Sequence, residues 1–124
     1  MTRVFDDDLS QAFGTRAIHA GVDGRDVHGL VTECFTEAGY ETRHDKKGSV
    51  GFFHGTGHGL GLEVHDPGRI SPAVSAPLKL GSVLTVEPGL YYPGLGGCRW
   101  EDVVQVTEGP AKILSRHPYQ WEIR

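Results

Sequence analysis

The sequence contains few of the features that mark secreted, membrane-spanning or nucleic-acid-binding proteins. It has only two cysteines, Cys34 and Cys98, with no CxxC pair and no signal peptide, so we expect both thiols to be reduced and packed. No apolar run approaches the roughly 20 residues of a membrane helix. The net charge of −4 argues against a nucleic acid or an anionic membrane as partner. We therefore expect a soluble, cytoplasmic protein.

Glycine, in contrast, is abundant. The 18 glycines lie between valines, leucines and isoleucines, which is typical of tight turns and close backbone approaches rather than of disorder. A chain of 124 residues without a repeat or a linker fits one domain, residues 1–124, and is long enough to bury a core without disulfides or a structural metal.

The stretch from residue 54 to residue 66 concentrates the chemistry. It carries His54, His58 and His65 among glycines. Histidine is a common metal ligand and acid/base group, and carboxylates that could complete a metal shell follow at Glu87 and Glu101. The glycines exclude a stable helix, so a site with two histidines on one helical face is not expected. The histidines could also be solvated residues of a glycine-rich bend.

Two helices are predicted at the start of the chain. In the first, Asp6, Asp7 and Asp8 would lie at the N-terminus, and Leu9, Phe13, Ala17 and Ala20 recur at helical spacing. The second would be capped by Asp23, with Asp26 in a weak capping box, and would end at Gly39. Its expected buried face consists of Val27, Leu30, Val31, Cys34 and Ala38, whereas His19 and His28 are expected at the surface or at its boundary.

Strands are predicted after Val50, following a charged loop at residues 41–48. Residues 59–65 alternate, with Leu60, Leu62 and Val64 expected toward the core and His65 toward a site. Residues 67–81 read as a surface loop and residues 88–97 as a turn-rich connection. Strands are expected at residues 83–87, 99–106 and 111–114.

Three ordered motifs resemble the catalytic half of the pita-bread metallopeptidases, in the branch of Xaa-Pro aminopeptidases and Xaa-Pro dipeptidases (prolidases), with methionine aminopeptidase a more distant relative. They are His54-Gly-Thr-Gly-His58-Gly-Leu-Gly-Leu-Glu-Val-His65-Asp66, Leu78-x-x-Gly81-x-Val-x-Thr-Val-Glu87-Pro-Gly-Leu-Tyr91 and Gly96-Gly-Cys-Arg99-Trp-Glu101-Asp102. The resemblance covers roughly residues 10–124. It implies an α+β fold that corresponds to the second half of the pita-bread fold, with two helices packed on a mostly antiparallel sheet.

The resemblance also implies a role for each matching residue. The metal ligands would be His58, Glu87 and Glu101, with Glu101 bridging two ions. His65 would contact substrate or shuttle a proton, and His54 would line the pocket beside it. Arg99 and Tyr91 would support the carboxylates. One imidazole with carboxylates suits Mn, Co, Zn or Fe(II), and the substrate would be a peptide with proline at its second position.

This sequence departs from the family pattern at two aspartate ligands, which lie upstream of the matched motifs in the family. Met1-Thr-Arg-Val-Phe5 weakly resembles the end of the segment that carries the second of them. We therefore expect a truncated or partial chain whose metal site is weak and mononuclear, or empty. A missing N-terminal half would leave apolar surface uncovered, and a homodimer in which a second copy replaces that half is one hypothesis.

Three classes of function follow. The chain is an inactive fragment of an Xaa-Pro peptidase, a working metallohydrolase whose missing ligands come from a partner chain or from local residues such as Asp102 or Asp6–Asp8, or a metal-free binding module with the same fold. The set of metal-site residues disfavours the third class. In the absence of metal, Glu87 and Glu101 could instead pair with Arg99 in a structural salt bridge.

Overall fold

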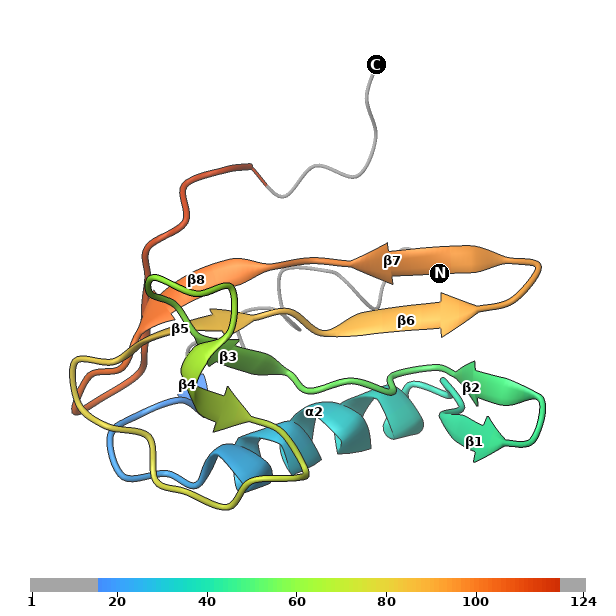
Figure 1. The fold of residues 1–124 in the computed structure, drawn as a ribbon, viewed down its shortest axis with the longest axis horizontal. Coiled ribbons are helices and arrows are strands. Elements are labelled where there is room, and N and C mark those ends of the chain that lie inside the picture. The colour runs from blue at the N-terminus through green and yellow to red at the C-terminus, as the bar shows by residue number, and fades with distance from the viewer. Residues whose placement is uncertain (1–15, 119–124) are drawn as a thin grey trace.

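The computed structural model of the chain describes residues 16–118. Within this range one α-helix precedes a series of short strands (Figure 1). The elements are α2 (Gly24–Glu37), β1 (Arg43–Asp45), β2 (Gly48–Val50), β3 (Gly57–Gly59), β4 (Asp66–Ile70), β5 (Val83–Val86), β6 (Gly89–Tyr92), β7 (Gly96–Arg99), β8 (Asp102–Gln105) and β9 (Lys112–Ile113). No helix in residues 16–118 has the length and apolar character needed to cross a membrane.

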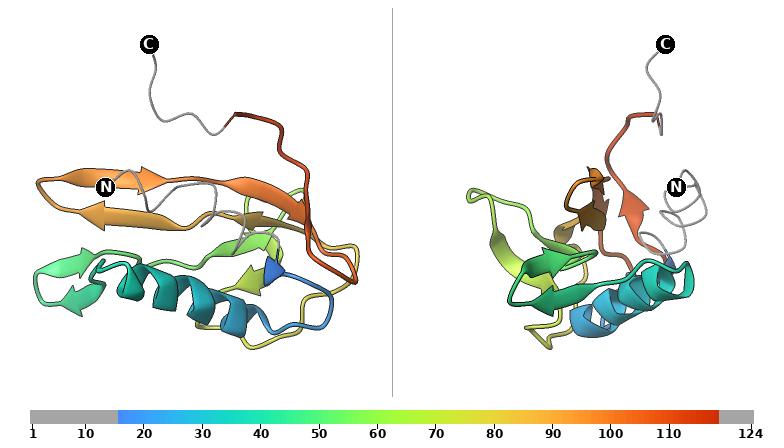
Figure 2. Two further views of the ribbon diagram at one scale, coloured as in Figure 1. Left: turned by 180° about the vertical axis from the view of Figure 1, so that it is seen from behind. Right: turned by 90° about the vertical axis from the view of Figure 1, so that its right-hand side faces the viewer.

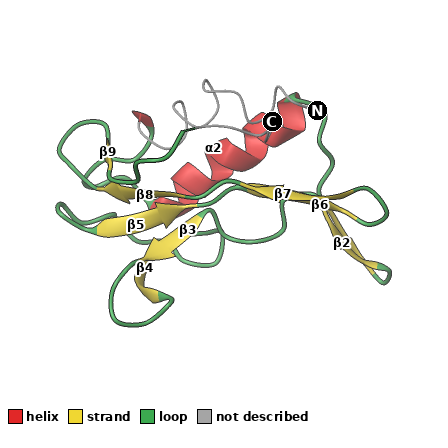
Figure 3. Ribbon diagram, turned by 90° about the horizontal axis from the view of Figure 1, so that it is seen from above, coloured by secondary structure: helices red, strands yellow, loops and turns green. Residues whose placement is uncertain are grey.

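The central layer is a five-stranded antiparallel sheet in the order β4-β3-β5-β8-β9. Two hairpins, β1–β2 and β6–β7, extend from it in the same direction, and α2 lies alongside the strands (Figures 1 and 2). Viewed from above, the helix covers one side of the strand layer along most of its length (Figure 3). The expected mostly antiparallel sheet is therefore present.

The start and end of helix α2 match the sequence prediction. The side chain of Asp23 accepts a hydrogen bond from the backbone N–H of Arg25, which caps the N-terminus. At the other end Gly39 has a φ of 87°, the left-handed conformation that glycine adopts without strain after a helix. The helix thus begins and ends where its capping residues predict.

The buried face of α2 differs from the predicted one. Its buried residues are Gly24, Val27, His28, Val31 and Phe35. Leu30 is 47% exposed, and the prediction that His28 lies at the surface or its boundary was wrong, because this residue is buried, at 9% exposure. The helix is rotated so that the aromatic ring of Phe35 packs against Phe52, which the helical spacing alone could not reveal.

Two apolar clusters hold the helix on the strands. Val27 belongs to the larger cluster, which contains Ile18, Ile70, Leu78, Leu84, Val86, Val104, Val106 and Ala111. Val31 and Phe35 belong to a second cluster with Phe52 and Leu90, beneath the β6–β7 hairpin. Both ends of the helix are therefore anchored, one on the central sheet and the other on the hairpin.

The first predicted helix falls mostly on residues 1–15, which lie outside the described range, together with its proposed aspartate cap. Residues 17–20 are not helical, so the expected extension of that helix through Ala17 and Ala20 was wrong. Residues 16–118 contain one helix rather than the two that were expected. In the same segment Ile18 is fully buried, and the backbone N–H of Ala20 donates to the carbonyl of Thr107.

The predicted strand at residues 59–65 is wrong beyond Gly59. Residues 60–65 form a loop, and Leu60, Leu62 and Val64 are 50%, 105% and 77% exposed. In this loop Gly61 lies against the carboxylate of Asp66, at a position where a Cβ atom would be only 1.5 Å from Oδ2. The alternating apolar residues therefore face outward instead of into the core.

Two predicted loops instead contain hairpins. The charged residues 41–48 form part of the β1–β2 hairpin, which turns through Gly48 at a φ of 122°. The turn-rich residues 88–97 form most of the β6–β7 hairpin. Residues 67–81 also begin with a strand, β4, before they become a loop. The predicted strands at 83–87 and 111–114 correspond to β5 and β9.

The predicted strand at 99–106 is interrupted rather than continuous. Strand β7 ends at Arg99 and β8 begins at Asp102. Opposite this gap, β5 ends at Val86 and β6 begins at Gly89. Pro88 has no backbone N–H to donate, so it interrupts the hydrogen-bond ladder at this point. The two interruptions lie side by side.

Candidate metal centre

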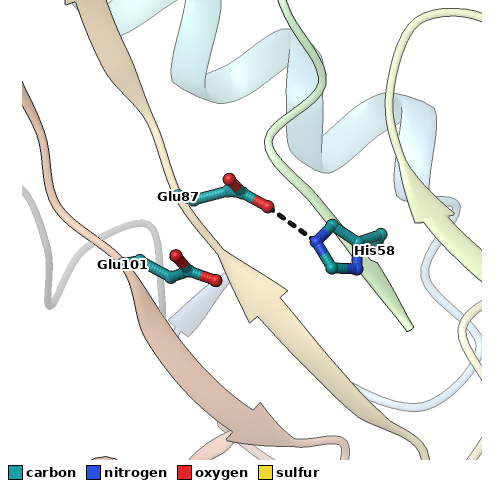
Figure 4. A group of neighbouring side chains, drawn as sticks. All are labelled: His58, Glu87 and Glu101. Atoms are coloured by element: carbon teal, nitrogen blue, oxygen red, sulfur yellow. Dashed lines mark ion pairs between the residues drawn. The ribbon is translucent and has the colours of Figure 1, made fainter. Parts of the chain in front are cut away.

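Three predicted ligands converge at the junction between the sheet and the β6–β7 hairpin. His58 lies on β3, Glu87 follows β5 directly, and Glu101 precedes β8 directly. One potential ligand atom from each lies within 4.8 Å of the others (Figure 4). Among residues 16–118 this is the group of histidine, cysteine and carboxylate side chains that could hold a metal ion.

The strand register explains why the two glutamates meet. Val86 pairs with Asp102 on one side of the interruption, and Gly89 pairs with Arg99 on the other. The same register continued through the gap places Glu87 opposite Glu101. Directly opposed carboxylates repel each other, and a cation between them relieves this repulsion.

His58 presents one ring nitrogen to the carboxylates. Its Nδ1 lies 2.9 Å from the carbonyl oxygen of Gly59, so an N–H at Nδ1 donates to that carbonyl. This hydrogen bond leaves Nε2 as the ring nitrogen that could bind a metal ion. Nε2 lies 3.0 Å from Oε1 of Glu87 (Figure 4). A histidine ligand whose other nitrogen donates to a backbone carbonyl has a fixed ring orientation.

The sequence reasoning missed Thr85, which joins two of these residues. The backbone N–H of His58 donates to Oγ1 of Thr85 at 3.1 Å, and the same hydroxyl donates to Oε1 of Glu87 at 2.9 Å. Thr85 is only 1% exposed. The available signal was its position two residues before Glu87 on a predicted strand, because alternate strand residues share a face.

Close approach of β3 to β5 depends on Gly57. A Cβ atom at this position would lie 1.8 Å from the carbonyl oxygen of Thr85. No larger residue fits without moving one strand. The glycine before His58 therefore sets the spacing between the histidine and the strand that leads to Glu87.

Arg99 lies at the edge of the group. Its Nε is 3.9 Å from Oε2 of Glu87, and its side chain is 51% exposed. Because Arg99 is half exposed and the separation is near the limit of an ion pair, this contact contributes little to stability. The alternative in which Arg99 holds the carboxylates in a structural salt bridge therefore receives only weak support.

His54 and Tyr91 form a separate hydrogen-bonded pair. Nδ1 of His54 donates to the carbonyl of Gly55 at 2.8 Å, so its Nε2 accepts the hydroxyl proton of Tyr91 at 2.9 Å. Phe52 and Phe53 pack against the His54 ring at centroid distances of 5.2 and 6.3 Å. In this structure Tyr91 orients His54, the residue that the resemblance assigns to the pocket.

His65 lies on the exposed loop after β3, and its ring is 4.6 Å from that of His58 in an edge arrangement. Arg69 holds this loop by donating to the carbonyl oxygens of Asp66, Gly68 and His65 at 2.6, 2.9 and 3.4 Å. The two histidine rings are therefore adjacent although seven positions separate them.

The donor set fits a divalent ion. It consists of one imidazole nitrogen and two carboxylates, a set suited to Zn, Mn, Co or Fe(II). Two ligand atoms that each lie about 2.1 Å from one ion are separated by about 3 Å to 3.5 Å, and the His58 to Glu87 distance of 3.0 Å is within this range. Because Glu101 is exposed, the group is open to solvent on its side.

Comparison with known proteins agrees with this geometry. Residues 9–108 match the sequence model of metallopeptidase family M24. The chain is 38% identical over 107 residues to the Xaa-Pro dipeptidase of Pyrococcus furiosus, an alignment that covers 86% of this chain and 28% of that protein. The chain thus spans less than a third of the length of this relative.

Solved structures show the same similarity. X-Pro aminopeptidase from Thermotoga maritima matches with a TM-score of 0.76 and 35% identity, over 90% of this chain and 29% of that one. Prolidase from Pyrococcus furiosus matches with a TM-score of 0.74 and 38% identity, over 88% of this chain and 30% of that one. The pita-bread fold implied by the motifs is therefore confirmed for the part that this chain spans. The chain belongs to metallopeptidase family M24, in the branch that contains Xaa-Pro dipeptidases and aminopeptidase P.

Proposed function

We propose that this chain contributes His58, Glu87 and Glu101 to a metal-dependent active site that hydrolyses the peptide bond before proline. The observation that carries the proposal is the convergence of these three ligand atoms within 4.8 Å from separate strands. The names of the similar proteins, Xaa-Pro dipeptidase and X-Pro aminopeptidase, support the substrate class. Mn, Co, Zn and Fe(II) are all compatible with the ligand set.

A divalent ion at this position would activate water and polarise the carbonyl of the scissile bond. The chain's own residues would orient the reactants. His65, exposed beside His58, would contact a substrate carbonyl or move a proton. His54 would line the pocket, held in one orientation by the hydroxyl of Tyr91.

Three ligands leave coordination positions open, and the family's two further aspartates have no counterpart in the matched motifs. We propose that the remaining ligands come from the N-terminal half of the fold, which lies outside this sequence, or from a second copy of the chain. The exposed loop that carries Leu62 and Val64 supports such a contact, because these apolar side chains are 105% and 77% exposed.

Assembly and metal content can be measured together. Light scattering with elemental analysis, before and after addition of Mn²⁺, Co²⁺ or Zn²⁺, gives the mass and the ions per chain. A dimer that holds metal supports a reassembled site. A monomer at micromolar concentration would count against the homodimer.

Activity requires a separate assay. The purified chain with Mn²⁺ or Co²⁺ is expected to cleave Ala-Pro slowly, and not Ala-Gly. Glu101→Gln, purified in parallel, is the control for contaminating peptidases, because it keeps the size of the side chain and removes its charge. A metal-loaded dimer that cleaves no Xaa-Pro peptide would contradict a site completed by a second copy and would favour a non-catalytic module.

A further inference from the structure

Helix α2 reaches the metal-site strands through one buried polar contact. His28 lies in the middle of the helix, and its Nδ1 is 3.0 Å from Oγ1 of Thr56, a residue with no exposed surface. Thr56 lies two residues after His54 and two residues before His58. We infer that His28 is a positioning residue that fixes Thr56, and through it holds His58 and Glu87 at the separation that an ion requires. This inference rests on the proposed function of the site.

The hydrogen-bond directions around His28 follow from its neighbours. The hydroxyl of Thr32 donates its hydrogen bond to the backbone carbonyl of His28 at 3.0 Å. The same hydroxyl oxygen therefore accepts a hydrogen bond from the N–H at Nε2 of the ring, at 3.4 Å. Nδ1 of the neutral ring then accepts the hydroxyl proton of Thr56. Burial and the nearby His54 lower the pKa of His28, which agrees with a neutral ring.

Thr56 is a junction between the strands around the site. Its backbone N–H donates to the carbonyl of Ile70 at 2.7 Å, and its carbonyl accepts the backbone N–H of Glu87 at 2.7 Å. Its hydroxyl is held as well, by the hydrogen bond to His28. His28 therefore acts on a residue whose carbonyl directly holds the backbone of a proposed metal ligand.

A second contact strengthens the link between the helix and the site. The ring of His28 lies 5.1 Å from that of Phe52, and Phe52 lies 5.2 Å from the ring of His54. His28 thus touches both ends of the segment from Phe52 to Thr56. A leucine at position 28 would fill the space, but it would leave the buried hydroxyl of Thr56 without its acceptor.

The test compares three variants of the complete 124-residue chain. His28→Leu removes the acceptor, whereas His28→Asn retains an oxygen near the position of Nδ1. Val27→Ala is the matched control, because Val27 is also buried on α2 and makes only apolar contacts. The first readout is amide hydrogen exchange at Glu87 in metal-free protein, relative to global stability. The second is the Kd for Co²⁺.

We expect His28→Leu to accelerate exchange at Glu87 and to raise the Kd by about 10-fold, the usual size for an outer contact to a metal ligand. His28→Asn should restore both properties. The inference is overturned if His28→Leu changes neither property, or if Val27→Ala changes both by as much.

Metal binding and the positioning role of His28 can be tested separately. If the wild-type chain binds no Co²⁺, the proposed function is wrong, while exchange at Glu87 still decides whether His28 positions this residue. If His28→Leu does not fold, Thr56→Val removes the other partner of the same hydrogen bond and is expected to give the same two changes. Unchanged exchange and unchanged Kd in Thr56→Val would overturn the inference.

Discussion

Glu87 and Glu101 stand opposite each other where the paired strands β5–β8 and β6–β7 are interrupted. In the absence of metal this arrangement places two carboxylates side by side, which is unfavourable. With a cation between them it becomes a ligand pair. The pair of glutamates therefore lowers the stability of the metal-free fold and at the same time provides two ligands for an ion.

This relationship gives the first prediction. Glu101→Gln should stabilise the metal-free chain by about 0.5 kcal/mol, since it removes the repulsion between opposed charges, and it should weaken metal binding at the same time. Urea denaturation with and without Mn²⁺ measures both effects. Lys112→Gln, at an exposed position on β9, serves as a control for a change of surface charge. Loss of stability in metal-free Glu101→Gln would contradict the proposed repulsion.

Thr85 gives a second prediction. Thr85→Val should cost about 1 to 2 kcal/mol of stability, because the backbone N–H of His58 and the carboxylate of Glu87 both lose a partner. Metal affinity should also fall by about 10-fold. Thr85→Ser keeps the hydroxyl and should retain most of the affinity. Calorimetric titration with Co²⁺ measures the affinity of each variant. Equal affinities of Thr85→Val and Thr85→Ser would count against this role of the hydroxyl.

Gly57 and Gly29 give a third prediction, because alanine at these two positions should change stability in opposite directions. Gly57→Ala places a Cβ atom 1.8 Å from the carbonyl oxygen of Thr85, so we expect a loss of about 3 kcal/mol or more. Gly29→Ala meets no atom within 4 Å on the exposed side of α2 and should stabilise the chain by about 1 kcal/mol through helix propensity. Thermal denaturation compares the two. A tolerated Gly57→Ala would mean that β3 and β5 lie farther apart than described.

The lowered pKa of His28 gives a pH prediction. In the unfolded chain this histidine titrates near its ordinary value of 6.5, whereas in the fold its pKa is lower, chiefly through burial. Below pH 6.5 the unfolded state therefore binds more protons, and the stability contributed by neutral His28 is lost as the pH falls toward its folded-state pKa.

The measurement is the free energy of unfolding between pH 8 and pH 5, in about six steps, for the wild-type chain and His28→Asn. The two proteins share their other histidines, so the difference between their pH curves isolates His28. We expect the wild-type chain to lose more stability than the variant below pH 6.5. Parallel curves would show that the pKa of His28 is not lowered by folding.

The sequence predicted those elements whose signals are local. Asp23 and Gly39 predicted the ends of α2 because capping depends on neighbouring backbone groups. Strand β5 was predicted from a short apolar run that is buried in the fold. The motifs also identified His58, Glu87 and Glu101 as residues that come together, before any geometry was known.

The errors concern features that depend on tertiary contacts. Leu60, Leu62 and Val64 alternate like a strand, but they lie in an exposed loop in which Gly61 packs against Asp66. The predicted face of α2 placed Leu30 toward the core and therefore His28 away from it. In the fold Leu30 is 47% exposed and His28 is buried. Its buried partner, Thr56, lies 28 positions away in the sequence, and nothing local links the two.

Whether these residues bind a metal ion is tested by a calorimetric titration of the metal-free chain with Mn²⁺ or Co²⁺, repeated for His58→Ala, Glu87→Gln and Glu101→Gln. We expect saturable binding by the wild-type chain and a loss of affinity of at least about 10-fold in each variant. Absence of binding by the wild-type chain, or equal binding by all four proteins, would contradict the assignment of these residues as metal ligands.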